Sequence, residues 1–335
     1  MHIGAGKCGS SSLQAHLSAN PHLTGHDGRA YEYACIKKNG RLLRGPAAKK
    51  AAARSPFGYS ASVSVRELNQ PHIALGLREA FQTMAEEGVT PILSFEGWIN
   101  AGTRFADWNI LECFGLEPRV IGFIRPQIPW LNSSWWQWGA WSNKGFEAWL
   151  SHWRLRGLWA TALVTWQGLP QVRSVDFFTT SGDVVNRFHN WLEAPLAAKP
   201  VRANATLDGT MLRFLQRHPH LKRGGHAAAM DFVLAKHVKR GAAPPPWVLP
   251  LDRIRTLIAE YKKDNMRLLD LVDLETRSEI AADPAWWCAD HFADKTAEPP
   301  DGVALSDADL EDIALRSFMA IPDMAELMRR RAENE

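Results

Sequence analysis

The spacing of apolar and polar residues predicts strands that alternate with helices along the first half of the chain. Residues 1–3 form a short apolar run, a glycine-rich turn follows over residues 4–9, and residues 10–20 have the apolar spacing of a helix. The apolar runs at 91–95 and 120–124 have the length of buried strands. Strands that alternate with helices favour an α/β protein with a parallel sheet flanked by helices.

Further helices are predicted along the whole chain, and the second half is predicted to be mainly helical. A helix is expected over residues 65–87, with Gly88 as its stop signal, and an apolar run at 172–178 precedes a helix that starts near Asp183. From Leu207 onward only helical patterns occur. The helices of this half are therefore expected to pack around or beside the sheet.

These patterns also suggest domain boundaries. We expect an α/β domain over residues 1–275 and a helical C-terminal extension over residues 276–335. Residues 35–60 are rich in glycine, alanine and serine and carry the basic residues Lys37, Lys38, Arg41, Arg44, Lys49 and Lys50. Such a composition predicts a mobile basic insert at the surface, which could attract an anionic glycan or simply be solvated.

Composition indicates a globular protein without a strong overall electric field. The 335 residues are 46% hydrophobic and 22% charged, and the formal net charge is +3. This small charge argues against nucleic acid as a partner, so any anion site must be local. The chain has no run of 18 apolar residues and no leader-like N-terminus, so we expect neither a membrane span nor a signal peptide.

The cysteines Cys8, Cys35, Cys113 and Cys288 are scattered along the chain without a CxxC pair. Their spacing indicates neither a zinc site nor a disulfide framework, and we expect no bound metal. Reduced thiols and the lack of a signal peptide predict a cytoplasmic protein.

Tryptophan is unusually frequent: the chain has 15, and nine of them lie within residues 130–166. Trp135 and Trp138 are three residues apart and Trp149 and Trp153 are four apart, so each pair would share one face of a helix. This spacing favours packing in the core. The alternative is that exposed members of the group stack against the sugar rings of an acceptor.

The glycine-rich turn has the features of an anion-binding site. It joins a strand to a helix, where free backbone N–H groups and the positive end of the helix dipole favour phosphate. Its glycines permit close approach of the backbone, its lysine adds a positive charge, and its serine hydroxyls can donate hydrogen bonds. The expected binding residues are Gly6, Lys7, Cys8, Gly9, Ser10, Ser11 and Ser12. The simpler interpretation is a turn that caps a helix.

The turn departs from the Walker A sequence GxxxxGK(S/T), because Met1 stands at the first glycine position and Cys8 at the hydroxyl position. The pattern HIGxxKxGSSSLQ instead resembles the 5′-phosphosulfate loop of the sulfotransferases, especially the bacterial type HIGxxKTGTTSLQ. Cys8 stands at the usual first threonine, and Ser10 and Ser11 stand at the usual threonine pair. Serine keeps the hydroxyl, whereas a thiol is a weak donor.

A second element has the order and spacing of the same family. Sulfotransferases carry an arginine at the end of a later strand and a serine eight residues on, which grip the 3′-phosphate of 3′-phosphoadenylyl sulfate (PAPS). Here Arg125 follows the apolar run at 120–124, and Ser133 lies eight positions later. An arginine offers a planar fork for a phosphate, and the serine would lie about two helical turns further along.

Three further segments resemble the bacterial sulfotransferases, namely SFEGW at 94–98, PHIAL at 71–75 and RANATLDGTMLRFL at 202–215. Together the resemblance implies a P-loop-like α/β fold, PAPS as co-substrate and adenosine 3′,5′-bisphosphate as product. The acceptor would be a hydroxyl or an amine, and a saccharide, a lipid and a small metabolite all stay open as its source.

Sulfuryl transfer needs a positive charge for the leaving group and a base for the proton of the acceptor. Lys7 is the candidate for the first task. Three residues are candidates for the base: His72, whose ordinary pKa is near neutral; Glu96, which follows a strand; and Glu32, which resembles the glutamate base of glycosaminoglycan sulfotransferases. Each also has a structural interpretation: a packed histidine, a helix-capping carboxylate and a solvated surface charge, respectively.

Two other functions stay open. A P-loop small-molecule kinase shares the strand, loop and helix, but it predicts a Walker lysine-hydroxyl pair and an aspartate at a strand end, and neither is found. A catalytically inactive relative that binds a nucleotide or a glycan is favoured by Cys8 and by the short strand at residues 1–3. A start codon assigned too far downstream would also explain that short strand.

Overall fold

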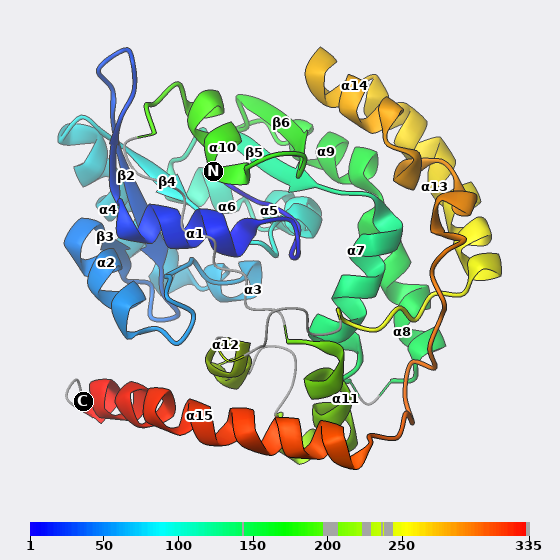
Figure 1. Ribbon diagram of the computed structural model, residues 1–335. Coiled ribbons are helices and arrows are strands. Elements are labelled where there is room, and N and C mark those ends of the chain that lie inside the picture. The colour runs from blue at the N-terminus through cyan, green and yellow to red at the C-terminus, as the bar shows by residue number, and fades with distance from the viewer. Residues whose placement is uncertain (143, 197–206, 223–228, 236, 238–243, 333–335) are drawn as a thin grey trace. The chain divides into compact units, whose positions relative to one another are not determined.

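The structure is a computed structural model that describes residues 1–142, 144–196, 207–222, 229–235, 237 and 244–332. Within these ranges the side chains that it does not describe are those of Pro71, His72, Ala229, Met230, Phe232, Leu327 and residues 330–332. The chain forms two units, each built from three separate stretches of sequence (Figure 1). Unit 1 comprises Met1–Arg125, Leu158–Ala203 and Lys263–Asp283, and unit 2 comprises Pro126–Gly157, Asn204–Lys262 and Pro284–Glu335.

A mixed sheet, made of a four-stranded and a two-stranded part that His2 bridges, forms the centre of unit 1. Its strands are β1 (His22–Thr24), β2 (Ala30–Ile36), β3 (Leu42–Arg44), β4 (Val89–Leu93), β5 (Arg119–Ile124) and β6 (Ser174–Thr179). β2 pairs in parallel with β4, and β5 pairs in parallel with β6, while the short strands β1 and β3 add to β2 in antiparallel register. The α/β class and the parallel sheet expected from the sequence are therefore confirmed.

The first three residues join the two halves of this sheet. His2 forms parallel bridges to Ser94, just beyond β4, and to Ile121 of β5. Its N–H donates to the carbonyl of Leu93 at 2.8 Å, and the N–H of Ile3 donates to that of Ile121 at 2.9 Å. The glycine-rich loop thus leaves the sheet from its middle, between β4 and β5, where the carboxyl ends of parallel strands form a crevice.

Helices surround the sheet of unit 1 (Figure 1). They are α1 (Ser10–Ala19), α2 (Gly45–Arg54), α3 (Val65–Leu68), α4 (Pro71–Glu86), η1 (Ile99–Ala101), α5 (Gly102–Asp107), α6 (Ile110–Phe114), α9 (Trp159–Gln167), α10 (Val184–Leu192), the end of α13 (Leu251–Leu269) and α14 (Leu274–Ala282). None of the helices in the described ranges combines the length and the apolar composition needed to cross a membrane.

Aromatic side chains fill the core beside α5 and α9. The ring of Phe105 lies 5.7 Å from that of Trp98 and 4.8 Å from that of Trp166, measured between centroids. The indole N–H of Trp166 donates to the carbonyl of Ile99 at 3.1 Å, and that of Trp98 donates to the carbonyl of Val63 at 3.1 Å. Both indoles therefore satisfy their polar atom while the rest of the ring is buried.

Two local expectations differ from the structure. The helix expected over residues 65–87 is interrupted between α3 and α4, because Pro71 takes the first helical position of α4 and disfavours helical geometry in the residue before it. Residues 35–60, expected as a mobile insert, contain the end of β2, then β3 and α2. Lys37 within this segment donates from its ammonium to Ser60 Oγ at 2.6 Å.

The two units also divide the chain differently from the expected ranges 1–275 and 276–335. α14 runs across that boundary and belongs to unit 1. Its Glu279 receives two hydrogen bonds from the Arg187 guanidinium of α10, at 2.5 and 2.7 Å. Such a bidentate pair joins parts of the chain that lie 92 residues apart, a contact that composition along the sequence does not reveal.

Unit 2 is helical in the ranges described. It contains α7 (Gln127–Ser134), the π-helical turn η2 (Trp135–Gly139), α8 (Phe146–Trp153), η3 (Arg154–Gly157), α11 (Gly209–Arg217), η4 (Pro219–Leu221), α12 (Ala229–Ala235), the first part of α13, η5 (Pro284–Trp286), η6 (Ala289–Phe292) and α15 (Asp307–Ala332).

Most of the clustered tryptophans are packed in the interior, as their spacing predicted. Trp135 lies edge-on against Trp149 with centroids 5.3 Å apart, and both are buried. Trp138 stacks on Trp153 with centroids 4.9 Å apart, and these two are partly exposed. The rings of η2 and α8 thus form a row that is stabilised by the burial of aromatic surface, by edge-to-face contact of Trp135 with Trp149 and by stacking of Trp138 on Trp153.

Candidate functional site

The glycine-rich loop places Lys7 in a strained conformation. Lys7 and Gly9 both lie in the left-handed region, with φ of 65° and 82°. Glycine adopts this region freely, whereas for a lysine it costs about 1–2 kcal/mol. Hydrogen bonds within the loop hold the turn, among them one from the Cys8 N–H to the carbonyl of Ala5 at 3.3 Å. Strain of this kind persists where the surrounding structure fixes it, and it is common at functional sites.

α1 begins directly after the loop and lacks a side-chain cap. Its N-cap residue is Gly9, and Ser10 Oγ donates instead to the carbonyl of Ala5 at 3.2 Å. Ser10 is buried, whereas Ser11 and Ser12 are partly exposed. The helix start can therefore present the N–H groups of its first turn and the Ser11 and Ser12 hydroxyls to an anion, while Ser10 maintains the shape of the loop.

The beginning of the loop is packed on a buried histidine. A Cβ atom at Gly4 would lie 2.4 Å from His2 Nε2, so the close approach requires glycine. His2 Nδ1 lies 2.8 Å from Ser94 Oγ, which also accepts a hydrogen bond from Gln14 Nε2 at 3.1 Å. Burial, assisted by the N-terminal ammonium, lowers the pKa of His2 to about 3, so the ring is neutral at physiological pH.

Arg125 follows β5 directly and its side chain reaches the loop. One guanidinium nitrogen, Nη1, donates to the carbonyl of Lys7 at 3.4 Å. The Arg125 carbonyl accepts from the indole N–H of Trp159 at 3.0 Å, which fixes the backbone from which the side chain extends. Arg125 is partly exposed, so the guanidinium can also donate to a ligand beside the loop. The structure thus brings two of the residues expected to bind the ligand, Lys7 and Arg125, together.

Glu96 is the acidic candidate that lies next to the loop. It follows β4 in a turn fixed by the N–H of Trp98, which donates to the carbonyl of Phe95 at 3.3 Å. Burial raises the pKa of Glu96, and the Lys7 ammonium opposes that rise. A carboxylate held near a lysine, with a pKa shifted toward neutrality, has the properties of a general base.

The buried Cys8 thiol interacts electrostatically with Lys7, Arg125 and Glu96. Burial raises the pKa of Cys8 to about 12; the charges of Arg125 and Lys7 act against the rise and that of Glu96 adds to it. Cys8 is fully buried. The thiol therefore stays protonated and buried in the loop at neutral pH, so it is not a reactive thiolate.

Tyr59 belongs to the same cluster, although the sequence analysis did not select it. Its hydroxyl lies 3.4 Å from Ser11 Oγ, and burial together with the nearby charge of Glu96 raises the pKa of Tyr59 to about 12. The next residue, Ser60, donates from its N–H to Ser18 Oγ of α1 at 3.0 Å. The only signal in the sequence was that Tyr59 is an aromatic residue with a hydroxyl, in a segment whose composition indicated a loop.

Glu32 lies elsewhere in the sheet. It is buried in β2, and its Oε2 accepts from Arg44 Nε at 2.6 Å, while Oε1 lies 3.7 Å from His22 Nδ1. Glu32 is therefore part of a buried ion pair beside the antiparallel strands β1 and β3, and the expectation of a solvated surface charge was wrong. In the described ranges no hydrogen bond or ion pair connects Glu32 with the loop.

The remaining two candidates are not placed against the loop. His72 lies in the first turn of α4, but its side chain is outside the described part of the structure. Ser133 is partly exposed in α7 and belongs to unit 2, whereas Arg125 ends the first segment of unit 1. The segment expected over residues 202–215 lies partly outside the described residues, which resume at Leu207.

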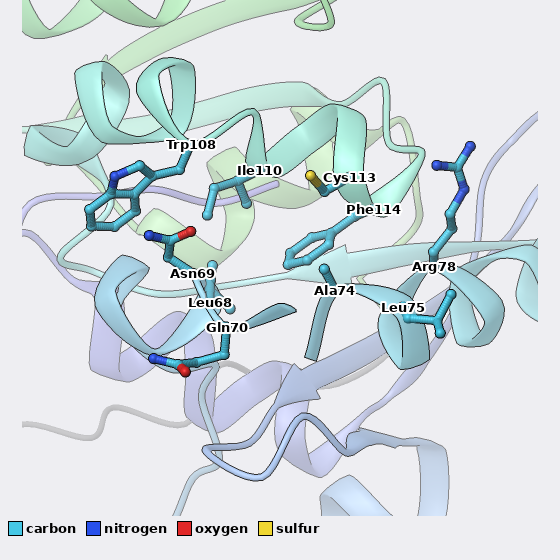
Figure 2. A pocket seen from close by; sticks show the side chains of 10 residues that line it. All are labelled: Leu68, Asn69, Gln70, Ala74, Leu75, Arg78, Trp108, Ile110, Cys113 and Phe114. Atoms are coloured by element: carbon cyan, nitrogen blue, oxygen red, sulfur yellow. The ribbon is translucent and has the colours of Figure 1, made fainter. Parts of the chain in front are cut away.

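A pocket of about 450 Å³ lies between α4 and α6 of unit 1 (Figure 2). Its lining residues are Leu68, Asn69, Gln70, Ala74, Leu75, Arg78, Trp108, Ile110, Cys113 and Phe114. The walls are mostly apolar, with Trp108 at one end and Arg78 at the other, as Figure 2 shows. No pocket could be expected here from the sequence, although Ala74 and Leu75 belong to the PHIAL segment, because the pocket forms only where α4 and α6 meet.

The described residues contain no group of three or more His, Cys, Asp or Glu side chains that could hold a metal ion. Comparisons with models of known protein families, with curated proteins and with solved structures found no match for this chain. The resemblance to the sulfotransferases therefore rests on the residues of this chain alone.

Proposed function

We propose that the chain binds PAPS at the loop over residues 4–12 and transfers its sulfuryl group to a hydroxyl or amine, on a saccharide or a small metabolite. In this proposal the sheet of unit 1 is P-loop-like, with the loop leaving its middle strand. The observation that carries the proposal is the loop itself, in which the left-handed turn at Lys7 leads into the uncapped start of α1 and Arg125 Nη1 donates to the Lys7 carbonyl at 3.4 Å. The resemblance of HIGxxKxGSSSLQ to the sulfotransferase loop selects PAPS among anionic ligands.

The donors at the loop suit the two ends of this co-substrate. The uncapped start of α1, with the Ser11 and Ser12 hydroxyls, would bind the 5′-phosphosulfate, since N–H groups and a helix dipole favour phosphate. Arg125 would bind the 3′-phosphate, for which its guanidinium offers paired donors. Ser133 is the second residue proposed for the 3′-phosphate.

The proposed chemistry needs a base for the acceptor and a positive charge for the leaving group. Glu96 takes the proton from the acceptor as the acceptor oxygen or nitrogen forms a bond to sulfur. The bond between sulfur and the bridging oxygen breaks, and that oxygen keeps the electron pair on the 5′-phosphate of adenosine 3′,5′-bisphosphate. Lys7 neutralises the charge that develops on this oxygen, an interaction that strengthens in the transition state.

Among the three base candidates, Glu96 is preferred because of its surroundings. It interacts with Lys7, and its pKa is shifted toward neutrality. Glu32 is occupied by Arg44, and His72 stays an alternative on sequence grounds alone.

Selective nucleotide binding tests the proposal. We expect titration calorimetry of the full chain to show tighter binding of adenosine 3′,5′-bisphosphate than of ATP or AMP. Arg125→Ala should lower the affinity for the bisphosphate roughly 10-fold to 100-fold, as expected for the loss of one charge-assisted contact of about 1.5–3 kcal/mol. The affinity for AMP should change much less. Arg119→Ala, at the opposite end of β5, is a matched control and should bind like the unchanged chain. Tighter binding of ATP than of the bisphosphate, or no binding of either, would contradict the proposed PAPS site.

Glu96→Gln tests the base. Transfer at pH 7 should fall roughly 10²-fold, the lower end of the range for general-base catalysis, while the affinity for the bisphosphate stays the same. Because the pKa of Glu96 is raised, the unchanged enzyme should lose activity as the pH falls through a value above that of an ordinary glutamate, and the variant should lack this step. The readout is the pH profile of kcat/KM.

Stability separates this result from a folding defect. A glutamate with a raised folded-state pKa reduces stability as the pH rises through that pKa, since the folded protein then carries a poorly solvated charge. Glu96→Gln removes this charge and should be at least as stable as the unchanged chain at pH 7. An active Glu96→Gln enzyme with an unaltered pH profile would assign the proton to another residue, and His72→Asn would be tested next.

A further inference from the structure

α15 carries an exposed apolar face along most of its length. Leu310, Phe318, Ile321 and Met328 are 41%, 71%, 55% and 67% exposed. Exposed alanines at 314 and 325 continue the same side of the helix, because all six positions are spaced by three or four residues. The helix has 26 residues and is about 39 Å long at 1.5 Å per residue.

The opposite face of α15 already has its partners. Ile313, Arg316 and Ala320 are buried, and the helix packs on α11 and α12 of the same unit (Figure 1). The Arg316 guanidinium pairs with Asp208, the N-cap residue of α11, and with Asp312 at 2.6 Å. α15 is thus fixed in unit 2 by one side, and its apolar side is not needed for that packing. Contiguous apolar surface of this kind on a soluble protein marks an interaction site.

The six positions of this stripe are nearly symmetric about a common midpoint, and the exposed Leu315 and Met319 lie beside the stripe without symmetric counterparts. Phe318 and Ile321 are equally distant from the point between residues 319 and 320, and so are the alanines at 314 and 325. Leu310 and Met328 fit the same symmetry to within one residue. A face with this property can pack against an identical helix that runs in the opposite direction, which is the requirement of a twofold contact between copies.

The charges at the two ends favour the same antiparallel pairing. The first six residues of α15 include four acids, Asp307, Asp309, Glu311 and Asp312, and the sequence near its end has three consecutive arginines at 329–331. Antiparallel helices would place each acidic end beside a basic end, whereas parallel helices would place like charges together. The acidic end also disfavours an anionic lipid surface, which would attract a helix with basic flanks throughout.

We propose that α15 is a homodimerisation surface, on which a second copy of this chain binds through its own α15 in antiparallel orientation. Phe318 and Ile321 lie at the centre of the contact, next to the twofold axis. The proposal is independent of the reaction at the loop of unit 1.

Sedimentation velocity of the full chain over a range of concentrations tests the proposal. The unchanged chain should sediment as a dimer at micromolar concentration. The double variant Phe318→Glu/Ile321→Glu should weaken dimerisation at least tenfold and sediment as a monomer. Because both side chains are exposed, its thermal unfolding curve at a concentration where both proteins are monomeric should be unchanged.

A leucine on another helix provides the matched control. Leu274 at the start of α14 is 80% exposed, so Leu274→Glu adds the same charge to an exposed apolar site outside α15. This variant should dimerise like the unchanged chain.

Oxidative cross-linking tests the orientation. In a background with Cys113→Ser and Cys288→Ser, which removes the exposed thiols, the double variant Ala314→Cys/Ala325→Cys should give disulfide-linked dimers, and each single variant should give far fewer. The two positions are about 16 Å apart along one helix, too far for a disulfide within a chain. A monomeric unchanged chain, a dimer that survives Phe318→Glu/Ile321→Glu, or a monomer that binds phosphatidylserine vesicles through this face would each overturn the proposal.

Discussion

Lys7→Ala is expected to reduce sulfuryl transfer by roughly 10³-fold, the size of effect seen when a group that stabilises developing charge is removed. The loss should appear mainly in kcat, because the charge on the bridging oxygen grows only as the bond to sulfur breaks. Affinity for adenosine 3′,5′-bisphosphate should fall less, since Arg125 and the start of α1 remain. Initial rates with PAPS and the acceptor found by screening provide the measurement.

The backbone at Lys7 offers a control that separates chemistry from folding. Lys7 has φ of 65°, a conformation that glycine adopts without strain. Lys7→Gly removes the ammonium and relieves the backbone, so it should be at least as inactive as Lys7→Ala while unfolding at an equal or higher denaturant concentration. If Lys7→Gly kept its turnover, Lys7 would serve only to shape the loop, and the transfer mechanism proposed for it would be wrong.

Trp166→Ala is expected to cost about 3–5 kcal/mol in the free energy of unfolding, which is the usual range for removing a large aromatic side chain from a core. Trp166 has no solvent-exposed surface, it packs against Phe105, and its N–H satisfies the carbonyl of Ile99. The substitution therefore creates a cavity and leaves a buried acceptor without its donor. Urea unfolding followed by far-ultraviolet circular dichroism measures the difference.

Two further substitutions give this prediction its internal comparison. Trp166→Phe keeps much of the ring volume but not the N–H, so it should be less destabilising than Trp166→Ala and still worse than no change. Trp108 is partly exposed, and Trp108→Ala should cost much less. If Trp166→Ala and Trp108→Ala lowered the free energy of unfolding equally, the buried aromatic cluster beside α5 and α9 would not be a main source of the stability of unit 1.

The strands β4, β5 and β6 could be predicted because each overlaps an apolar run, whereas β2, which pairs in parallel with β4, was not predicted. Residues 120–124 coincide with β5 apart from one residue, and the run at 91–95 overlaps β4. The hairpin-like additions β1 and β3 were not predicted, because they are three residues long and at most partly buried, which leaves almost no apolar signal. Short edge strands depend on the register of their neighbour more than on their own composition.

The candidate site could be predicted only for residues that lie in a local sequence pattern or directly after one. The loop at residues 4–12 has a local pattern, and Arg125 has a recognisable place after a strand. Tyr59 and the pairing of Glu32 with Arg44 depend on how distant segments fold against one another, so no local pattern indicated them. The interleaving of units 1 and 2 has the same cause, since contacts such as Arg187 with Glu279 connect residues 92 positions apart.

The position of residues 1–3 in the middle of the sheet has a consequence for the nascent chain. These residues are synthesised before both of their neighbours, and Ile121, the more distant partner of His2, follows 119 residues later. Until then residues 1–3 can pair only with the end of β4, through Leu93 and Ser94, and contacts of such long range form slowly. Because the N–H of Ile3 donates to the carbonyl of Ile121, we expect the loop that follows Ile3 to acquire its final shape only after β5 has been synthesised.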